Sequence, residues 1–321
     1  MKNKKWLIYL FLFSAFFIVL SAVLAIMTPK KIEVPETDFT TTNKDGTSSQ
    51  FEDIKFIGYS FEIPSELPIA TIEDSELTPA HVEKQLIKDF QLTPLENAAN
   101  VMNGPKYSLT KDRRNGNYIF AKNEVPDEVK IVDLEQTLEV AQNFLEEYFP
   151  NLELTPLTLK TKYYKAGFHL VETTEDAAEV VEIPFTYSIN NYPVMHAHEE
   201  EFPFKIMVYS DYQIQKVSFQ PLFIKLNINQ KAETISVYEA VDNINNNNKA
   251  SIIAAYQDEF GELSMNNIQS GDLKSVVIEY RVDKELGIAY PFYRFKGKLK
   301  NKENIQLRAE VITPAIELKQ E

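Results

Sequence analysis

The chain has 321 residues, of which 44% are hydrophobic, 12% aromatic and 25% charged, so general disorder is excluded. Its formal net charge of −14 opposes binding to nucleic acid and to anionic lipid headgroups, so we expect no nucleic-acid partner. Cysteine is absent, which excludes disulfides, thiol catalysis and cysteine-ligated zinc.

The N-terminus has the features of a membrane anchor. Residues 6–27 contain no charged side chain, and a helix of this length, rising about 1.5 Å per residue, crosses a hydrocarbon core of about 30 Å. Residues 1–5 hold three lysines, whereas only Lys30 and Lys31 follow the run closely. This bias predicts a cytoplasmic N-terminus, one transmembrane helix, and an extracytoplasmic body at the cell membrane.

A cleaved signal peptide is the alternative for the same segment. Val23-Leu24-Ala25 resembles a small-residue cleavage site, and cleavage after Ala25 would release the body. The apolar run is longer than the usual ~7–15 residues of a signal peptide, which favours the uncleaved anchor. The body is exported under both interpretations.

A polar linker and a first module are expected next. Residues 28–55 are predicted to be a linker, because their centre has no apolar side chain. In the module, residues 56–130, a strand over 56–63 precedes a helix that begins at Thr78-Pro79, a preferred N-cap followed by a preferred first helical residue. Asn115-Gly116, between two short apolar runs, predicts a β-hairpin.

Residues 131–230 are expected to form a second module. Its helix spans 134–149, with Asp133 as N-cap, one apolar face, and Pro150 after its end. Strand-like runs follow at 157–165, 168–172, 180–190, 192–196, 204–209 and 214–219.

Residues 231–321 are expected to form a third module. Ser236 and Glu239 fit a capping box at the start of a helix, and the asparagines of 245–248 predict a turn. Residues 251–256 suit a strand or a short helix, and Ser270-Gly271-Asp272 is interpreted as a turn. Further strands are expected at 275–282, 288–296 and 305–312. The predicted fold is α+β: tandem helix-plus-antiparallel-sheet modules behind one N-terminal transmembrane helix.

Residues 185–194 and 204–217 resemble the hairpin pattern of PepSY-like and YycH/YycI-type extracytoplasmic domains. Residues 278–282 followed by 289–295 resemble the closing strand pair of the same domains, so the resemblance covers roughly residues 133–312. It implies that the chain restrains a membrane histidine kinase, as YycH/YycI-type proteins do, or regulates peptidases, as PepSY-like domains do. No catalytic residues are known in either group, and fold alone does not transfer function.

Two constellations are candidates for a site. His196 and His198 lie on one face of a strand at a metal-ligand spacing, although a strand end followed by three glutamates is more often simply solvated. The aromatic cluster Tyr290, Phe292, Tyr293 and Phe295 is a candidate surface for a peptide or glycan. The favoured alternative is that these aromatics fill sheet faces.

No GxSxG elbow or glycine-rich phosphate motif occurs, so the sequence predicts no catalytic residues and no cofactor. The expected function is that of a non-enzymatic, membrane-anchored protein that regulates or senses through contact with a membrane or envelope protein. Two alternatives stay open: an exported scaffold or peptide- or cell-wall-binding module, and a metal-dependent hydrolase that uses His196 and His198.

Overall fold

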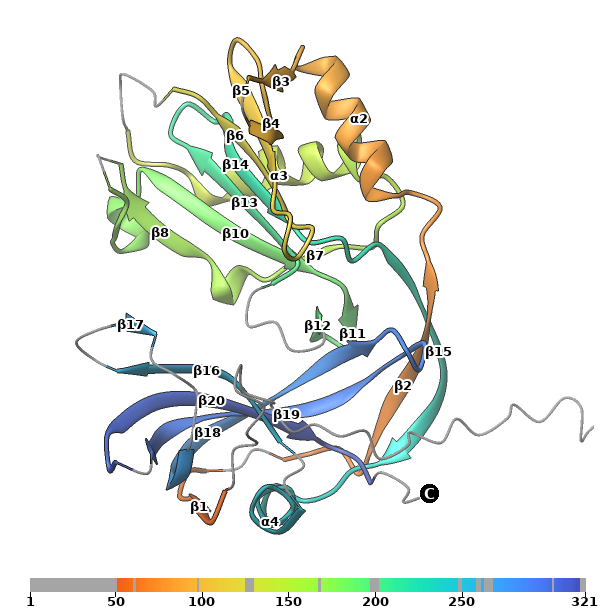
Figure 1. Cartoon of the computed structure of the whole chain (residues 1–321), viewed down its shortest axis with the longest axis vertical. Coiled ribbons are helices and arrows are strands. Elements are labelled where there is room, and N and C mark those ends of the chain that lie inside the picture. Colours follow the sequence, from red (N-terminus) through yellow and green to blue (C-terminus); the bar gives the residue numbers. More distant parts are fainter. Residues whose placement is uncertain are drawn as a thin grey trace, which may run out of the picture. The chain divides into compact units, whose positions relative to one another are not determined.

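The computed structural model describes residues 51–59, 62–96, 98–124, 130–166, 169–196, 202–247, 250–257, 261–262, 268–301 and 303–317. All of them belong to one compact unit, residues 37–317. Figure 1 shows the described residues as two large β-sheets with helices α2 (Pro79–Asp89), α3 (Leu134–Tyr148) and α4 (Val237–Asn247). The predicted α+β class is confirmed, with most of the structured residues in strands.

The first sheet is antiparallel throughout the described residues and takes strands from both sides of α3. Its strands are β3 (Thr93–Leu95), β4 (Ala98–Asn103), β5 (Tyr107–Lys111), β6 (Tyr118–Lys122), β7 (Thr155–Pro156), β8 (Lys162–Lys165), β9 (Val171–Glu172), β10 (Val180–Thr186), β13 (Phe204–Tyr209) and β14 (Ile214–Phe219). They lie in the order β3-β4-β5-β6-β14-β13-β10-β8-β9, with β7 beside β10. Because β6 pairs with β14, the first two predicted modules contribute to one common sheet.

The second sheet collects strands from the whole described chain. Its members are β1 (Asp53–Phe56), β2 (Glu66–Asp74), β11 (Ser188–Ile189), β12 (Tyr192–His196), β15 (Ile224–Glu233), β16 (Ser251–Gln257), β17 (Gly261–Glu262), β18 (Ile268–Asp283), β19 (Ile288–Asn301) and β20 (Gln306–Pro314). The main path is β11-β12-β18-β19-β20-β16-β17, and β2 joins β15 to β19. β1 and β12 run parallel to β18, so the expectation of purely antiparallel sheets is wrong.

Both helices of the first sheet begin where the sequence predicts. The side chain of Thr78 accepts a hydrogen bond from the backbone N–H of His81 at 3.3 Å, and Pro79 takes the first helical position of α2. Asp133 Oδ1 accepts from the N–H of Gln136 at 2.9 Å at the start of α3. These caps satisfy N–H groups that a helix cannot bond internally. The apolar faces of α2 and α3 then share one core cluster with the sheet, which includes Val82, Leu86, Ala141, Leu145, Phe120 and Ile183.

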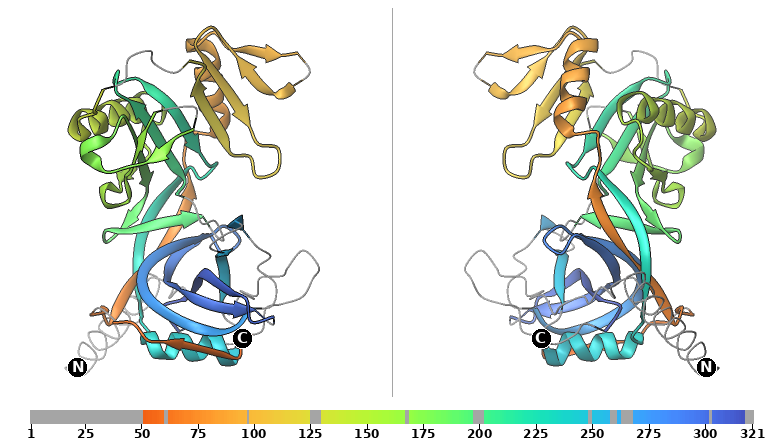
Figure 2. Two further views of the ribbon diagram at one scale, coloured as in Figure 1. Left: turned by 90° about the vertical axis from the view of Figure 1, so that its left-hand side faces the viewer. Right: turned by 90° about the vertical axis from the view of Figure 1, so that its right-hand side faces the viewer.

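The second sheet has a core of its own against α4. Both views in Figure 2 show α4 beside β1. Ser236 Oγ accepts from the N–H of Glu239 at 3.1 Å, as the predicted capping box requires. The buried stripe of the helix joins a cluster that includes Ile54, Val237, Ala240, Ile244, Leu273 and Phe295. Full burial of such side chains stabilises the fold by about 1.5–3 kcal/mol each.

The N-terminal expectations need two corrections. The predicted strand over 56–63 is wrong: β1 ends at Phe56, and the next strand, β2, begins at Glu66. Pro68 lies inside β2, where it is tolerated because β19 pairs with that strand only at Thr71 and Ala70. The last residues of the predicted linker 28–55 are also part of the fold, since the side chains of Phe51 and Ile54 are buried.

The predicted transmembrane segment, residues 6–27, lies outside the described residues, as does the linker before residue 51. None of the helices in the described ranges is long and apolar enough to span a bilayer. The transmembrane helix therefore stays a prediction. The module boundaries at 130 and 230 also stay predictions.

Most of the other predicted elements are present. The Asn115-Gly116 hairpin is confirmed as β5 and β6, with Gly116 at φ +74°. The run 157–165 is a strand only at its end, because residues Thr158–Lys160 form the 3₁₀ helix η1; a second one, η2, spans Glu175–Ala177. Residues 251–256 are strand, as β16.

Two predicted turns lie inside regular elements. Ser270-Gly271-Asp272 is part of β18, where these residues pair with both β1 and β19. Residues 245–247 continue α4 instead of leaving it. Asparagine is a poor helix former, but here Asn245 makes two hydrogen bonds to the backbone of Ile54 from its place in the helix.

Candidate functional site

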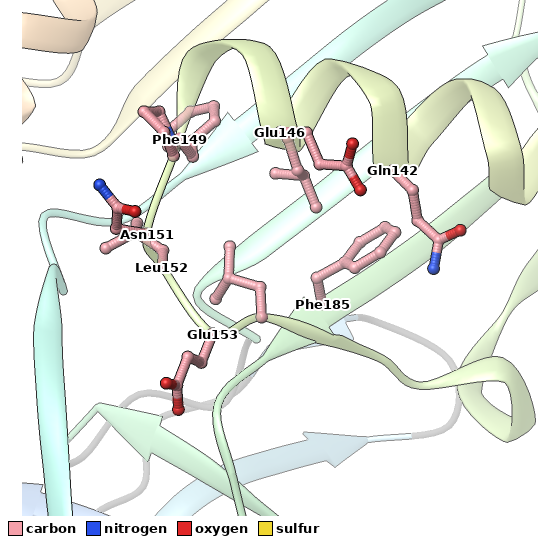
Figure 3. A pocket seen from close by; sticks show the side chains of 10 residues that line it. Gln142, Glu146, Phe149, Asn151, Leu152, Glu153 and Phe185 are labelled. Atoms are coloured by element: carbon pink, nitrogen blue, oxygen red, sulfur yellow. The ribbon is translucent and has the colours of Figure 1, made fainter.

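A surface cleft opens where α3 ends. Its volume is about 340 Å³, and it lies between α3, the segment 150–154 that follows, and β10. In Figure 3, Gln142 and Glu146 project from the helix toward Phe185 of β10, and Phe149, Asn151, Leu152 and Glu153 follow the chain around the opposite side. The cleft exists because Pro150 cannot continue the helix and Asn151 adopts a left-handed conformation, φ +66°, that turns the chain away.

The floor and the rim of this cleft differ in chemistry. The floor is apolar and consists of the buried side chains of Leu145, Phe149 and Phe185. The rim is polar and exposed, with the carboxylates of Glu146 and Glu153 as its charged groups. A cleft of this size is within the range of ligand sites, about 300–1,000 Å³. It suits an apolar side chain that is presented by a basic segment.

The floor is held rigidly by aromatic packing. The ring centroid of Phe149 lies 5.4 Å from that of Phe204 and 5.1 Å from that of Phe219, both in edge-on geometry. Contacts of this kind add about 0.5–1.5 kcal/mol beyond the burial of area. The cleft is therefore largely preformed, which lowers the entropy cost of binding.

A buried ionic network lies on β18, β19 and β20. Glu279 accepts hydrogen bonds from Arg281 Nε at 2.8 Å and from Arg294 Nη1 at 3.3 Å. Arg294 also donates to Glu310 from Nε at 2.5 Å, and Glu310 pairs with Lys296. Glu279 and Arg281 are each only 2% exposed. Removing two charges from water at this depth is costly unless each is paired, as these are.

The electrostatics of the network support a structural role. Burial alone would lower the pKa of Arg294, but Glu279 and Glu310 outweigh that effect and raise the pKa. Burial likewise raises the pKa of Glu310, and Lys296 and Arg294 reverse the shift, so the pKa lies below its ordinary value. Both net shifts favour the charged forms of these two side chains. Arg294 and Glu310 are therefore held as ion-paired, charged groups.

The predicted aromatic contact surface is buried. Tyr290, Phe292, Tyr293 and Phe295 are 1%, 3%, 0% and 0% exposed, so their rings fill sheet faces. Tyr293 and Phe295 point into the core against α4, and the Tyr293 hydroxyl donates to the C=O of Ile235 at 2.6 Å. The physical reason lies in what packs on the two faces of β19. α4 and its core cluster cover the face that carries Tyr293 and Phe295, and Tyr290 and Phe292 pack against each other on the opposite face, with ring centroids 4.8 Å apart.

The two histidines are not brought into a shared site by the described residues. His196 is half-buried at the end of β12, and its backbone C=O accepts from Arg281 Nη1 at 3.2 Å. His198 lies outside the described residues. Within the described ranges no group of three or more His, Asp or Glu side chains is arranged to hold a metal ion. The histidine metal site stays a prediction.

Sequence reasoning placed parts of the cleft without recognising it. Leu145 lies in the predicted helix 134–149, Phe185 lies in the predicted strand 180–190, and Pro150 follows the predicted end of the helix. The available signal was the charged Glu146 and Glu153 on either side of that stop. The ionic network had a signal too: Glu279 with Arg281, and Arg294 with Lys296, alternate at period two inside otherwise apolar strands.

Comparisons with known proteins give one structural likeness. No family model matches the chain, and no curated protein matches it. A solved structure, YycH from Bacillus subtilis, is similar with a TM-score of 0.38 and 11% sequence identity, over 78% of this chain and 53% of that one. The chain thus spans about half the length of YycH. The expected resemblance is met in part, as a weak likeness to YycH and with no match to a PepSY-like family, and likeness at this level shows no shared activity.

Proposed function

We propose that the chain is a membrane-anchored, non-enzymatic protein whose body lies outside the cytoplasm and regulates or senses through contact with another protein of the membrane or envelope. The observation that carries the proposal is the preformed cleft at the end of α3, with its apolar floor and acidic rim. A floor of aliphatic and aromatic side chains beside two carboxylates is suited to an apolar side chain on a basic protein segment.

The charge of the chain supports a basic partner. The net charge of the whole chain is −14. The segment before Ile32 contains lysines and no acidic residue, so the rest of the chain is more acidic still. An acidic field of this kind speeds encounter with basic surfaces and disfavours acidic ones. The anchor, residues 6–27, would keep the body beside partners in the same membrane and so raise their effective concentration.

Crosslinking in living cells tests the proposal. A photo-crosslinking amino acid replaces Gln142 or Asn151, which are exposed on the rim of the cleft, in the full chain at its native level. The matched control carries the same group at Arg113, which is exposed in the β5–β6 hairpin. We expect one discrete protein adduct from both rim positions and none from Arg113. Equal labelling from rim and control positions would refute the proposal.

The anchor has a separate test. Residues 6–27 are replaced by an unrelated transmembrane helix of the same length, and the adduct is measured again. If the protein acts within the membrane, exchange of the helix weakens the regulatory effect while the cleft adduct persists. The alternative function for the same cleft is that of an exported peptide-binding module. Such a module would keep its full effect after the helix is exchanged.

A further inference from the structure

The outer edge of β15 has no paired strand among the residues that the structure describes. In the described part of the chain β15 pairs with β2 alone. Ser75 N–H donates to the C=O of Phe223 at 3.0 Å, so Ser75 and Phe223 form a hydrogen-bonded pair of the antiparallel ladder. Such pairs recur at every second residue along β15. Ile224, Leu226 and Ile228 are the alternate residues, and their backbone N–H and C=O groups therefore point away from β2.

Two observed bonds agree with this orientation. Ile72, which lies opposite Leu226 in the register, directs its N–H away from β15 and to the C=O of Gly287 at 2.9 Å. Ile224 directs its N–H away from β2 and to the hydroxyl oxygen of Tyr187 at 3.2 Å. That hydroxyl in turn donates to the C=O of Leu222 at 3.0 Å. Tyr187 thus satisfies the first position of the edge and leaves the next positions open.

A second cleft lies along this edge. In the second sheet β11 is one end of the main path, and β15 is the last strand of the branch that β2 forms on β19. Residues of both strands line a cleft of about 120 Å³. An apolar cavity of about 150 Å³ holds benzene, so this one is of the size of a single aliphatic side chain. Its apolar lining is Ile189, Ile224, Leu226 and Ile228.

The chemistry of the cleft points to an extended peptide. Ile228 is 56% exposed, so its side chain is accessible to a partner at this edge. Glu153 lines this cleft and also the cleft at the end of α3, so it offers one carboxylate to both. The ladder shifts register after Ile228, and this bulge limits the usable edge to residues 224–228.

We propose that residues 224–228 of β15 bind an extended segment of a partner protein as an added strand, with one aliphatic side chain in the cleft beside Ile189 and a basic side chain at Glu153. Main-chain bonds supply affinity and the cleft supplies specificity, as in other strand additions. A second copy of this chain is a poor occupant, because both copies carry a net charge of −14. The inference rests on the proposed function and names the chemistry of its partner.

The test uses the full chain in cells, with the photo-crosslinking group in place of Lys225, which is exposed and lines the cleft. It is combined with Ile228→Pro, which removes an outward N–H without touching a bond to β2. The matched variant Ile228→Ala removes the side chain and keeps that N–H. We expect a discrete adduct that falls about tenfold in Ile228→Pro and only about threefold in Ile228→Ala.

Ile228→Lys is the second edge variant. The side chain of Ile228 is already more than half exposed, so we expect this variant to keep the fold. It should abolish the adduct as charged edges do in natural sheets. Equal losses in Ile228→Pro and Ile228→Ala would overturn strand addition. An adduct at twice the mass of the chain would overturn the choice of partner. If the crosslinker at position 225 gives no adduct while the one at position 142 gives a clear adduct, only this inference is overturned. If neither position gives an adduct, the proposed function is overturned as well.

Discussion

The carboxamide of Asn245 binds both backbone polar groups of Ile54. Asn245 Oδ1 accepts from the N–H of Ile54 at 2.9 Å, and Asn245 Nδ2 donates to the C=O of Ile54 at 2.9 Å. The side chain thus takes the place of a neighbouring strand on one edge of β1, whose other edge pairs with β18. A short strand at the start of the described chain is thereby secured by a helix that comes almost two hundred residues later.

Replacement of this amide should loosen β1. Asn245→Ala leaves two partly buried backbone groups without partners, and we expect a loss of about 1–3 kcal/mol in the free energy of unfolding. Asn246→Ala, on an exposed side chain of the same helix, is the control and should change stability by less than about 0.5 kcal/mol. Urea unfolding of the purified full chain measures both. Equal effects of the two substitutions would contradict the role of Asn245.

Glu279 is expected to be the most sensitive charge in the fold. Glu279→Gln removes the carboxylate that Arg281 and Arg294 share and leaves guanidinium charge buried, so stability should fall by about 3–5 kcal/mol. The exposed pair of Asp53 and Lys55, 3.1 Å apart and 63% exposed on both sides, is the control. Asp53→Asn should cost less than about 1 kcal/mol. The comparison is made by thermal or urea unfolding at neutral pH.

Acid should weaken the same network through Glu310. Its pKa is lowered in the folded protein, so its contribution to stability is present above the unfolded value of about 4.3 and is lost as the pH falls through the lower folded value. The stability difference between the wild type and Glu310→Gln is therefore largest near pH 7 and shrinks below about pH 4. Urea unfolding at pH 7, 5 and 3.5 measures it. A difference that stays constant with pH would show that Glu310 acts through its shape alone.

Gly297 marks a close approach of β18 and β19. A Cβ at this position would lie 2.2 Å from the backbone oxygen of Asp272, and the backbone of a paired strand cannot move away cheaply. We expect Gly297→Ala to cost about 3 kcal/mol. At Gly287, φ is +66° and a Cβ meets nothing within 4 Å, so Gly287→Ala should cost only about 1 kcal/mol. Similar unfolding midpoints for the two variants would argue against the steric explanation.

Elements set by local chemistry were predictable from the sequence. Asp133 caps its helix and Asn115-Gly116 turns its hairpin as expected, because each acts on neighbours within a few residues. The same reasoning gave a wrong prediction for the asparagines of 245–247, which were expected to form a turn and are helical. Asn245 is bonded within the helix to the backbone of Ile54, and nothing near either residue in the sequence indicates those two hydrogen bonds.

Strand partners and the candidate clefts were much less predictable. β1 and β12 pair with β18 although both are distant from it in sequence. A period-two pattern shows which side chains share a face of a strand, but it does not show which strand lies beside it. The aromatics of β19 show the same limit. The sequence places Tyr290 and Phe292 on one face, but only the tertiary packing on that face decides that it is buried.

The position of β18 also sets the order in which the body can be completed. β1 and β12 both pair with β18, and β2 pairs with β19 as well as with β15. These three strands therefore have all their partners only after residues 268–301 have been synthesised. Such distant pairings form slowly, and the waiting strands expose backbone that invites aggregation. Until those partners exist, the excess of negative charge on the chain opposes the self-association of its incomplete fold.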